Sequence, residues 1–119
     1  EVLRSVKKVW QDKNITMIFQ PHRYSRTEEH FNYFIDVLKG VDNLVLMDIY
    51  SANEKRIENI SSSVMADQIK KYNNNVSLIN DYQEIEKFIQ KNIVNNGILL
   101  TMGAGDISKF INSYKKILI

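Results

Sequence analysis

Hydrophobic and polar positions follow two alternating patterns along this chain, and each pattern predicts one kind of element. Short continuous apolar runs predict strands of a parallel sheet, because both faces of such strands are buried. Longer segments in which apolar residues recur at helical spacing predict helices. The predicted strands are 15–19, 44–47, 76–79 and 98–102, and the predicted helices are 1–10, 28–38, 63–72, 81–93 and 107–118.

Strand and helix patterns therefore alternate along the whole chain. This order is typical of an α/β fold, and it predicts a Rossmann-like three-layer sandwich, with a mainly parallel sheet of about four or more strands and helices on both faces. At 119 residues the chain is long enough for one domain and too short for two ordinary ones. We therefore expect residues 1–119 to form a single domain.

Flanking residues place the ends of the second predicted helix. It begins either at Ser25, with Glu28 completing a capping box, or at Thr27, with Glu28 and Glu29 in its first turn. Gly40 is expected to end the helix in the left-handed conformation that glycine favours.

The other helix starts differ in how clearly the sequence marks them. The serines at 61–63 offer N-caps for the helix at 63–72, whose inward-facing residues are predicted to be Met65, Ile69 and Tyr72. The helix that starts at Glu1 has no visible cap. This uncapped start suggests that the chain was cut from a longer protein.

Composition and charge exclude several classes of function. The 16 basic and 14 acidic residues are well mixed, so there is no basic stripe for binding nucleic acid. The chain has no cysteine, which excludes disulfides, a thiolate nucleophile and cysteine-ligated metal. No apolar run approaches the roughly 20 residues of a membrane span, and the N-terminus lacks a signal-peptide layout. We expect a cytoplasmic domain without nucleic-acid or membrane partners.

Three turns that follow predicted strands carry most of the candidate chemistry: 20–27, 48–54 and 101–106. In a parallel sheet these turns lie at the same edge, so they can converge on one ligand. Arg23 and Arg26 offer planar forks suited to a carboxylate or phosphate, and the N–H groups at the helix start also favour an anion. Alternatively, both arginines are solvated or pair with the glutamates that follow them.

The remaining polar residues of these turns are open to two interpretations each. His22 either hydrogen-bonds a ligand or is satisfied by a backbone carbonyl, whereas His30 is expected to be a surface residue. Neither histidine has a partner at metal-ligand spacing, so we expect no metal site. Tyr50 either packs on its loop or contacts a ligand, and Asp48 and Glu54 could bind a cation or an ammonium group.

A short glycine-rich turn, Gly103-Ala104-Gly105, follows the last predicted strand. Its glycines either let the backbone approach a ligand or serve only to pack the turn tightly. The turn lacks the third glycine of a dinucleotide fingerprint, and the chain contains no P-loop motif. The sequence therefore provides no nucleotide-binding motif of its own.

These turns resemble a known family when they are taken together and in order. The motifs are Phe19-Gln20-Pro21-His22-Arg23-Tyr24-Ser25-Arg26-Thr27, then Asp48-Ile49-Tyr50 with Ala52 and Glu54, then Gly103-Ala104-Gly105-Asp106-Ile107. Over essentially its whole length the chain resembles the C-terminal domain of the UDP-N-acetylmuramate–L-alanine ligases, a branch of the Mur ligase family. It departs from the usual pattern at Ser51, where proline is common, and at Asn53, where glycine is common.

The resemblance implies an activity for a larger protein. Such ligases have three domains, and this chain would be the C-terminal, amino-acid-presenting one, lacking its first strand. In the complete enzyme, ATP would phosphorylate the carboxylate of UDP-N-acetylmuramate, with Mg²⁺ on the phosphates. The amine of L-alanine would then attack the acyl phosphate, a step of peptidoglycan synthesis. This domain would close over the central ATPase domain, and alone it would be inactive and bind neither ATP nor metal.

The resemblance also implies roles for particular residues, none of them catalytic in this domain alone. L-alanine would be held by His22, Arg23 and Arg26. Contacts with the substrate or with the closing domain would come from Tyr50, Glu54, Gly103 and Gly105.

Two other functions compete with this interpretation. A signalling receiver domain could use Asp48 as a phosphoacceptor, but it needs an acidic pair after the first strand, and the turn after Phe19 supplies none. A free-standing α/β regulatory domain that binds an anionic metabolite is the alternative that stays open. It would bind its ligand with measurable affinity without partner domains.

Overall fold

A computed structural model describes residues 14–92 and 97–103. The predicted helices at 1–10 and 107–118 lie outside the described residues, as does Gly105. The described strands are β1 (Ile15–Phe19), β2 (Asn43–Leu46), β3 (Val76–Leu78) and β4 (Ile98–Met102). The described helices are α2 (Tyr24–Glu29), α3 (Phe31–Leu38), α4 (Ser62–Lys70) and α5 (Tyr82–Asn92).

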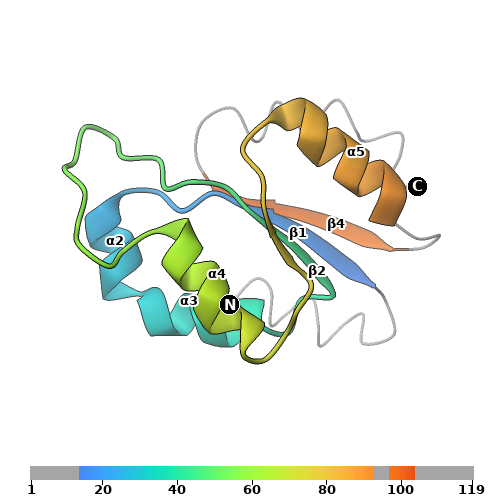
Figure 1. Cartoon of the computed structure of the whole chain (residues 1–119), viewed down its shortest axis with the longest axis horizontal. Coiled ribbons are helices and arrows are strands. Elements are labelled where there is room, and N and C mark those ends of the chain that lie inside the picture. Colours follow the sequence, from blue (N-terminus) through green and yellow to red (C-terminus); the bar gives the residue numbers. More distant parts are fainter. Residues whose placement is uncertain (1–13, 93–96, 104–119) are drawn as a thin grey trace.

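The four described strands form one sheet in the order β3-β2-β1-β4, and every pair is parallel. Helices cover both faces: α3 and α4 lie on one side of the sheet and α5 on the other (Figure 1). The predicted α/β sandwich with a parallel sheet is therefore confirmed. β1 lies inside the sheet between β2 and β4, so the turn that follows it has a strand end on either side.

Alternate residues of β1 enter two different cores, which explains its continuous apolar run. Ile15, Met17 and Phe19 pack with residues of α3 and α4, whereas Ile18 packs with Ile85 and other residues of α5. All five residues of β1 are buried. Burial on both faces is the reason why this strand carries no polar alternation.

The second predicted helix differs from the expectation. This helix is interrupted at His30 and forms two helices, α2 and α3. Gly40 directly follows Lys39, the αR C-cap of α3, as expected, but it does not have the positive φ of a left-handed residue.

The remaining local expectations concern the helix after β2 and the second histidine. Tyr72 was expected to face the core but is 67% exposed, because α4 ends at Lys70 and Tyr72 lies beyond it, under the ammonium group of Lys39. Met65 and Ile69 of α4 are buried as predicted. The expectation that His30 lies at the surface is confirmed.

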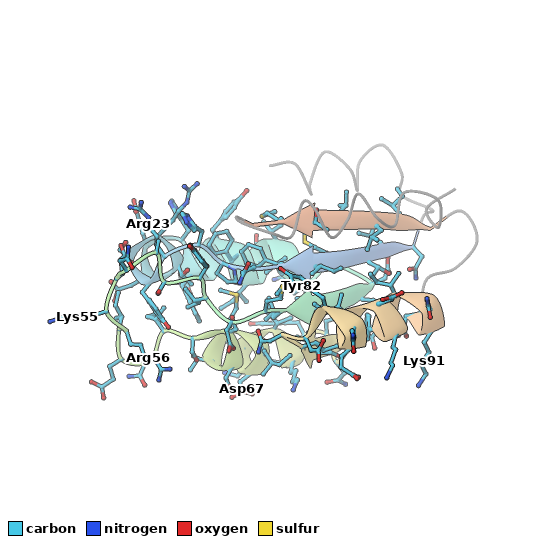
Figure 2. All side chains as sticks on the ribbon, turned by 90° about the horizontal axis from the view of Figure 1, so that it is seen from above. Arg23, Lys55, Arg56, Asp67, Tyr82 and Lys91 are labelled. Atoms are coloured by element: carbon cyan, nitrogen blue, oxygen red, sulfur yellow. The ribbon has the colours of Figure 1, made fainter. Side chains whose placement is uncertain are left out.

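The register of the sheet brings the three strand ends together. Phe19 pairs with Leu46 on one side and with Met102 on the other, so β1, β2 and β4 all end at the same edge. The loop that follows β2 extends beyond this edge and passes next to α2 (Figure 1). Arg23, Lys55 and Arg56 all lie at this end of the molecule (Figure 2).

Candidate functional site

The turn after β1 has an unusual backbone. α2 begins at Tyr24 with Arg23 as its N-cap, and no side chain of the turn caps it. Arg23 has a φ of 71° and a ψ of 139°, a combination that costs a non-glycine residue about 1–3 kcal/mol. The predicted capping box of Ser25 and Glu28 does not form, and the helix does not start at Thr27, because both Ser25 and Thr27 lie inside α2. The hydroxyl of Thr27 donates to the carbonyl oxygen of Arg23 at 2.7 Å. The start of α2 therefore needs support from elsewhere.

Part of that support comes from the backbone of the loop after β2. The N–H of Arg23 donates to the carbonyl oxygen of Tyr50 at 2.7 Å. The N–H of Tyr50 donates to the carbonyl oxygen of Pro21 at 2.8 Å. The rings of His22 and Tyr50 stack, with centroids 5.5 Å apart and planes 10° from parallel. Tyr50 thus packs on the first turn, although 49% of it remains exposed.

A carboxylate from the same loop provides the rest. The N–H and the hydroxyl of Ser25 donate to the two carboxylate oxygens of Glu54, at 3.0 and 2.6 Å. These bonds, chiefly the one from the hydroxyl, hold the pKa of Glu54 below its ordinary value, and the charge of Arg23 adds a smaller contribution. The anion at the start of α2 is therefore the chain's own Glu54 rather than a ligand.

The loop reaches this position through residues with left-handed backbone. Ala52 and Asn53 have φ values of 49° and 71°. Asparagine tolerates this region better than most residues do. Asn53 can therefore occupy the position where the family that this chain resembles commonly has glycine. This departure from the family pattern leaves the loop intact.

A pocket of about 270 Å³ opens where β1 and β4 end, and we name it the β1–β4 pocket. It is lined by Phe19, Gln20, His22, Arg26, Phe34, Met102 and Gly103. The aromatic rings of Phe19 and Phe34 are in contact, with centroids 5.1 Å apart. The pocket therefore combines an apolar wall with one guanidinium group and one imidazole.

Next to it is a second, more open hollow of about 450 Å³. It shares His22 and Arg26 with the β1–β4 pocket and adds Arg23, which does not line that pocket. Within residues 14–92 and 97–103, neither arginine forms an ion pair with a carboxylate, so the alternative in which Glu28 and Glu29 neutralise them is wrong. Both guanidinium groups are exposed and available to an anion.

Gly103 lines one side of the β1–β4 pocket, at a position that requires glycine. Its φ is 147°, and a Cβ at this position would lie 2.7 Å from the carbonyl oxygen of Gln20. The N–H of Gln20 in turn donates to the carbonyl oxygen of Met102 at 2.9 Å. The glycine therefore lets the ends of β1 and β4 approach each other closely, in agreement with the tight-packing interpretation of this turn.

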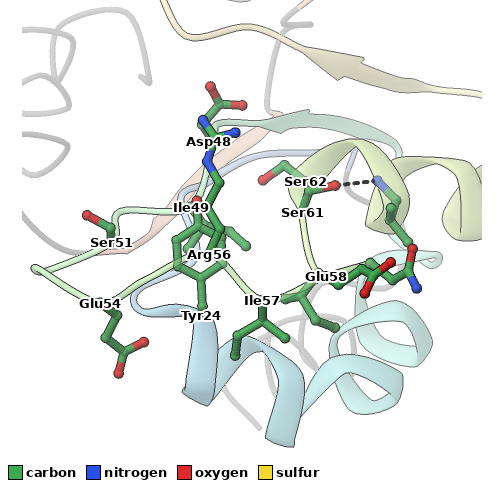
Figure 3. Close-up of a pocket in the computed structure, with 13 residues that line it drawn as sticks. Tyr24, Asp48, Ile49, Ser51, Glu54, Arg56, Ile57, Glu58, Ser61 and Ser62 are labelled. Atoms are coloured by element: carbon green, nitrogen blue, oxygen red, sulfur yellow. Dashed lines mark hydrogen bonds between the residues drawn. The ribbon is translucent and has the colours of Figure 1, made fainter.

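A larger, shallow hollow of about 740 Å³ is lined by the loop after β2 and by Tyr24, the first residue of α2 (Figure 3). It extends from Asp48 and Glu54 to Ser61 and Ser62 at the start of α4. The hydroxyl of Ser61 accepts a hydrogen bond from the N–H of Val64 at 3.1 Å, so this helix is capped locally. His22 and both arginines of the first turn are absent from its lining.

Comparison with known proteins identifies the family. No protein-family model matches the chain. The UDP-N-acetylmuramate–L-alanine ligase of Vesicomyosocius okutanii is 46% identical over 107 residues, which are 89% of this chain and 23% of that protein. The ligase of the same name from Wigglesworthia glossinidia brevipalpis is 40% identical over 116 residues, which are 97% of this chain and 24% of that protein. The chain belongs to the UDP-N-acetylmuramate–L-alanine ligase family.

A solved structure agrees with this assignment. The crystal structure of UDP-N-acetylmuramate-alanine ligase MurC from Thermotoga maritima matches with a TM-score of 0.66 and 25% sequence identity. The match covers 98% of this chain and 24% of the other. This chain therefore spans about a quarter of the length of the family members that it matches.

In the structure, the predicted site residues fall into three groups. His22, Arg26 and Gly103 come together in the β1–β4 pocket, and Arg23 lies in the adjoining hollow. Tyr50 packs on His22, and Glu54 bonds to Ser25. Gly105 lies outside the described residues.

Sequence reasoning missed the apolar wall of the β1–β4 pocket. Phe34 was assigned to a helix stripe, and Met102 was taken only as the end of a strand. The available signal was position: Met102 is the last residue of its strand, and Phe34 lies in the first half of the helix that follows the histidine turn. An apolar residue at the end of an element that lies next to the site can line the pocket and also pack in the core.

The described residues contain no group of three or more histidine, aspartate or glutamate side chains that could hold a metal ion. Within the same residues, no helix is long and apolar enough to cross a membrane.

Proposed function

We propose that this chain is the C-terminal domain of a three-domain, ATP-dependent ligase that joins L-alanine to UDP-N-acetylmuramate in bacterial peptidoglycan synthesis. Its task is to bind L-alanine and present it to the central ATPase domain of the same protein. ATP, Mg²⁺ and UDP-N-acetylmuramate belong to the other domains, and this domain alone is inactive. The enzyme works in the cytoplasm and serves cell-wall biogenesis, and through it cell shape and division.

The observation that carries this proposal is the β1–β4 pocket. It places the guanidinium group of Arg26 and the imidazole of His22 beside a small apolar wall. A small amino acid has matching parts: a carboxylate for the guanidinium group and a methyl group for the wall. Because Arg26 forms no internal ion pair within residues 14–92 and 97–103, its charge is available to this carboxylate.

The contribution to catalysis is one of position. With the carboxylate held by Arg26, with His22 in the same pocket and Arg23 in the adjoining hollow, the amine of L-alanine points out of the pocket toward the closing domain. The lone pair of the neutral amine attacks the acyl carbon of the muramoyl phosphate and forms the C–N bond. The C–O bond breaks, and phosphate leaves with its electrons and takes up the proton that the amine nitrogen loses. An oriented amine beside an activated acyl group can gain many orders of magnitude in rate from proximity alone.

The substitution Arg26→Ala in the full-length ligase tests the proposal. It removes a charge-assisted hydrogen bond worth about 1.5–3 kcal/mol, so the KM for L-alanine should rise roughly 10- to 150-fold. The KM for ATP should change less than about twofold, because the proposal assigns ATP to the other domains and the β1–β4 pocket to L-alanine. Steady-state kinetics with each substrate varied in turn provides the measurement.

Arg56→Ala is the matched control, since Arg56 is an exposed arginine that lines the other hollow. It should leave both constants unchanged. An unchanged L-alanine constant in the Arg26→Ala enzyme would remove Arg26 from the site. Micromolar binding of L-alanine or another small anion by this chain alone would instead support the free-standing regulatory domain.

A further inference from the structure

We propose that Glu54 is a positioning residue: its carboxylate fixes the first turn of α2 and thereby holds Arg26 at the β1–β4 pocket. The inference rests on the proposed function, because its readout is the affinity for L-alanine. It assigns Glu54 to the support of the site, whereas the family resemblance had suggested a contact with the substrate or with a closing domain.

α2 cannot hold its own start in place. It is only six residues long, and helices of this length are unstable without tertiary support. Its N-cap, Arg23, has an unfavourable backbone conformation and supplies no side-chain acceptor to the first N–H groups. An acceptor from another part of the chain must therefore compensate.

Glu54 is that acceptor. One carboxylate oxygen accepts from the N–H of Ser25 at 3.0 Å, and the other accepts from its hydroxyl at 2.6 Å. A carboxylate at this position also interacts favourably with the partial positive charge at a helix start. The lowered pKa of Glu54 has these two hydrogen bonds as its main causes, which is consistent with a carboxylate that remains ionised in the cap.

The cap acts on Arg26 through the short helix. Ser25 directly precedes Arg26, and Thr27 directly follows it. Thr27 is 1% exposed and bonds to Arg23 through both its N–H (3.1 Å) and its hydroxyl (2.7 Å). Arg26 is therefore held between two anchored neighbours, and one of those anchors is Glu54.

Direct contact between Glu54 and the substrate is a weaker explanation for this geometry. Glu54 lines the large shallow hollow and not the β1–β4 pocket. Each of its oxygens already accepts a hydrogen bond from Ser25. A second carboxylate close to the substrate's own carboxylate would also repel it.

A double-mutant cycle in the full-length ligase tests the proposal. Glu54→Ala should raise the KM for L-alanine about tenfold while kcat and the KM for ATP change less than about twofold. In an enzyme that already carries Arg26→Ala, the same change should add less than about twofold, because the group that it positions is gone. Glu54→Gln keeps one oxygen as an acceptor and should restore part of the affinity.

Glu58→Ala is the matched control: Glu58 lies on the same loop, and its carboxylate makes no hydrogen bond among the described residues. The Glu58→Ala enzyme should have the same kcat and the same KM for L-alanine and for ATP as the unmodified enzyme. Full additivity of Glu54→Ala and Arg26→Ala would overturn the positioning role and indicate a direct contact. Equal losses for L-alanine and ATP would overturn it as well, in favour of general destabilisation. An unmodified ligase that does not use L-alanine would instead contradict the proposed function.

Discussion

The helix starts of α2 and α4 lie on either side of the same loop, and they are built in opposite ways. α4 has Ser61 as its N-cap, with an extended backbone (φ −159°) and a hydroxyl that accepts from the N–H of Val64. α2 has Arg23 as its N-cap, with a φ of 71° and no cap of its own. Its missing acceptor comes from Glu54, 29 residues further along the chain.

The difference between the two helix starts separates a part of the scaffold, α4, from a part of the site, α2. A local cap such as Ser61 stabilises its helix whatever the surrounding structure does. A cap from another segment couples two turns, so the position of Arg26 depends on the conformation of the loop after β2. Within residues 14–92 and 97–103, Arg23 and Arg26 of this strained turn still form no ion pair with a carboxylate.

The largest effect that would sharpen this contrast is expected at Gly103, where the site again depends on a distant contact. Gly103→Ala combines an unfavourable φ with a clash against the carbonyl oxygen of Gln20, and it should lower the free energy of unfolding by about 2–4 kcal/mol. Gly40→Ala is the control, because its Cβ would meet nothing closer than 3.7 Å. Urea unfolding of the two variants measures the difference, and equal stabilities would contradict the close approach.

A smaller effect is expected from removal of the local cap. Ser61→Ala should lower the free energy of unfolding by about 1 kcal/mol, the usual value of an N-cap hydroxyl, and leave the KM for L-alanine unchanged. Ser63→Ala is the control, since the side chain of Ser63 is exposed and makes no hydrogen bond among residues 14–92 and 97–103. A raised KM in the Ser61→Ala ligase would break the distinction between scaffold and site.

The smallest effect concerns pH, to which only the carboxylate cap responds. Since the folded pKa of Glu54 is lowered, its stabilising contribution is complete above the unfolded pKa and is lost as the pH falls through the folded pKa. An NMR titration of the side-chain carboxyl should therefore place its pKa below the ordinary value for glutamate. The hydroxyl and then the N–H of Ser25 are the main groups that lower this pKa, so Ser25→Ala, which removes the hydroxyl, should move the pKa back upward. An ordinary value in the unmodified chain would show that the cap does not form.

Elements set by local sequence were predicted well. The bounds of β1 (Ile15–Phe19) and β4 (Ile98–Met102) are confirmed to the residue, because polar residues or turn formers flank their apolar runs. β2 begins and ends one residue earlier than predicted, at Asn43 and Leu46. The serine cap of α4 was also expected, since its donor and acceptor lie three residues apart.

Elements set by contacts distant in sequence were not predicted. The two starts predicted for the second helix, Ser25 and Thr27, were wrong because the helix begins at Tyr24. The acceptor for Ser25 is Glu54, which no local pattern can associate with it. Tyr72 was placed in the core because the sequence does not show that α4 has already ended. The convergence of the three turns was predictable from parallel pairing, but the apolar wall formed by Phe34 and Met102 requires knowledge of which strands are neighbours.

The strand order has a consequence for how the pocket forms during biosynthesis. β1 and β2 are close in the chain and can pair early, whereas β4 pairs with β1 from the far end of the sequence. Non-local pairings of this kind form late, because the chain must close a long loop first. The nascent domain therefore acquires Arg26, His22, Phe19 and Phe34 before it acquires Met102 and Gly103, so a ribosome-bound chain that stops short of Ile98 lacks the β4 side of the pocket.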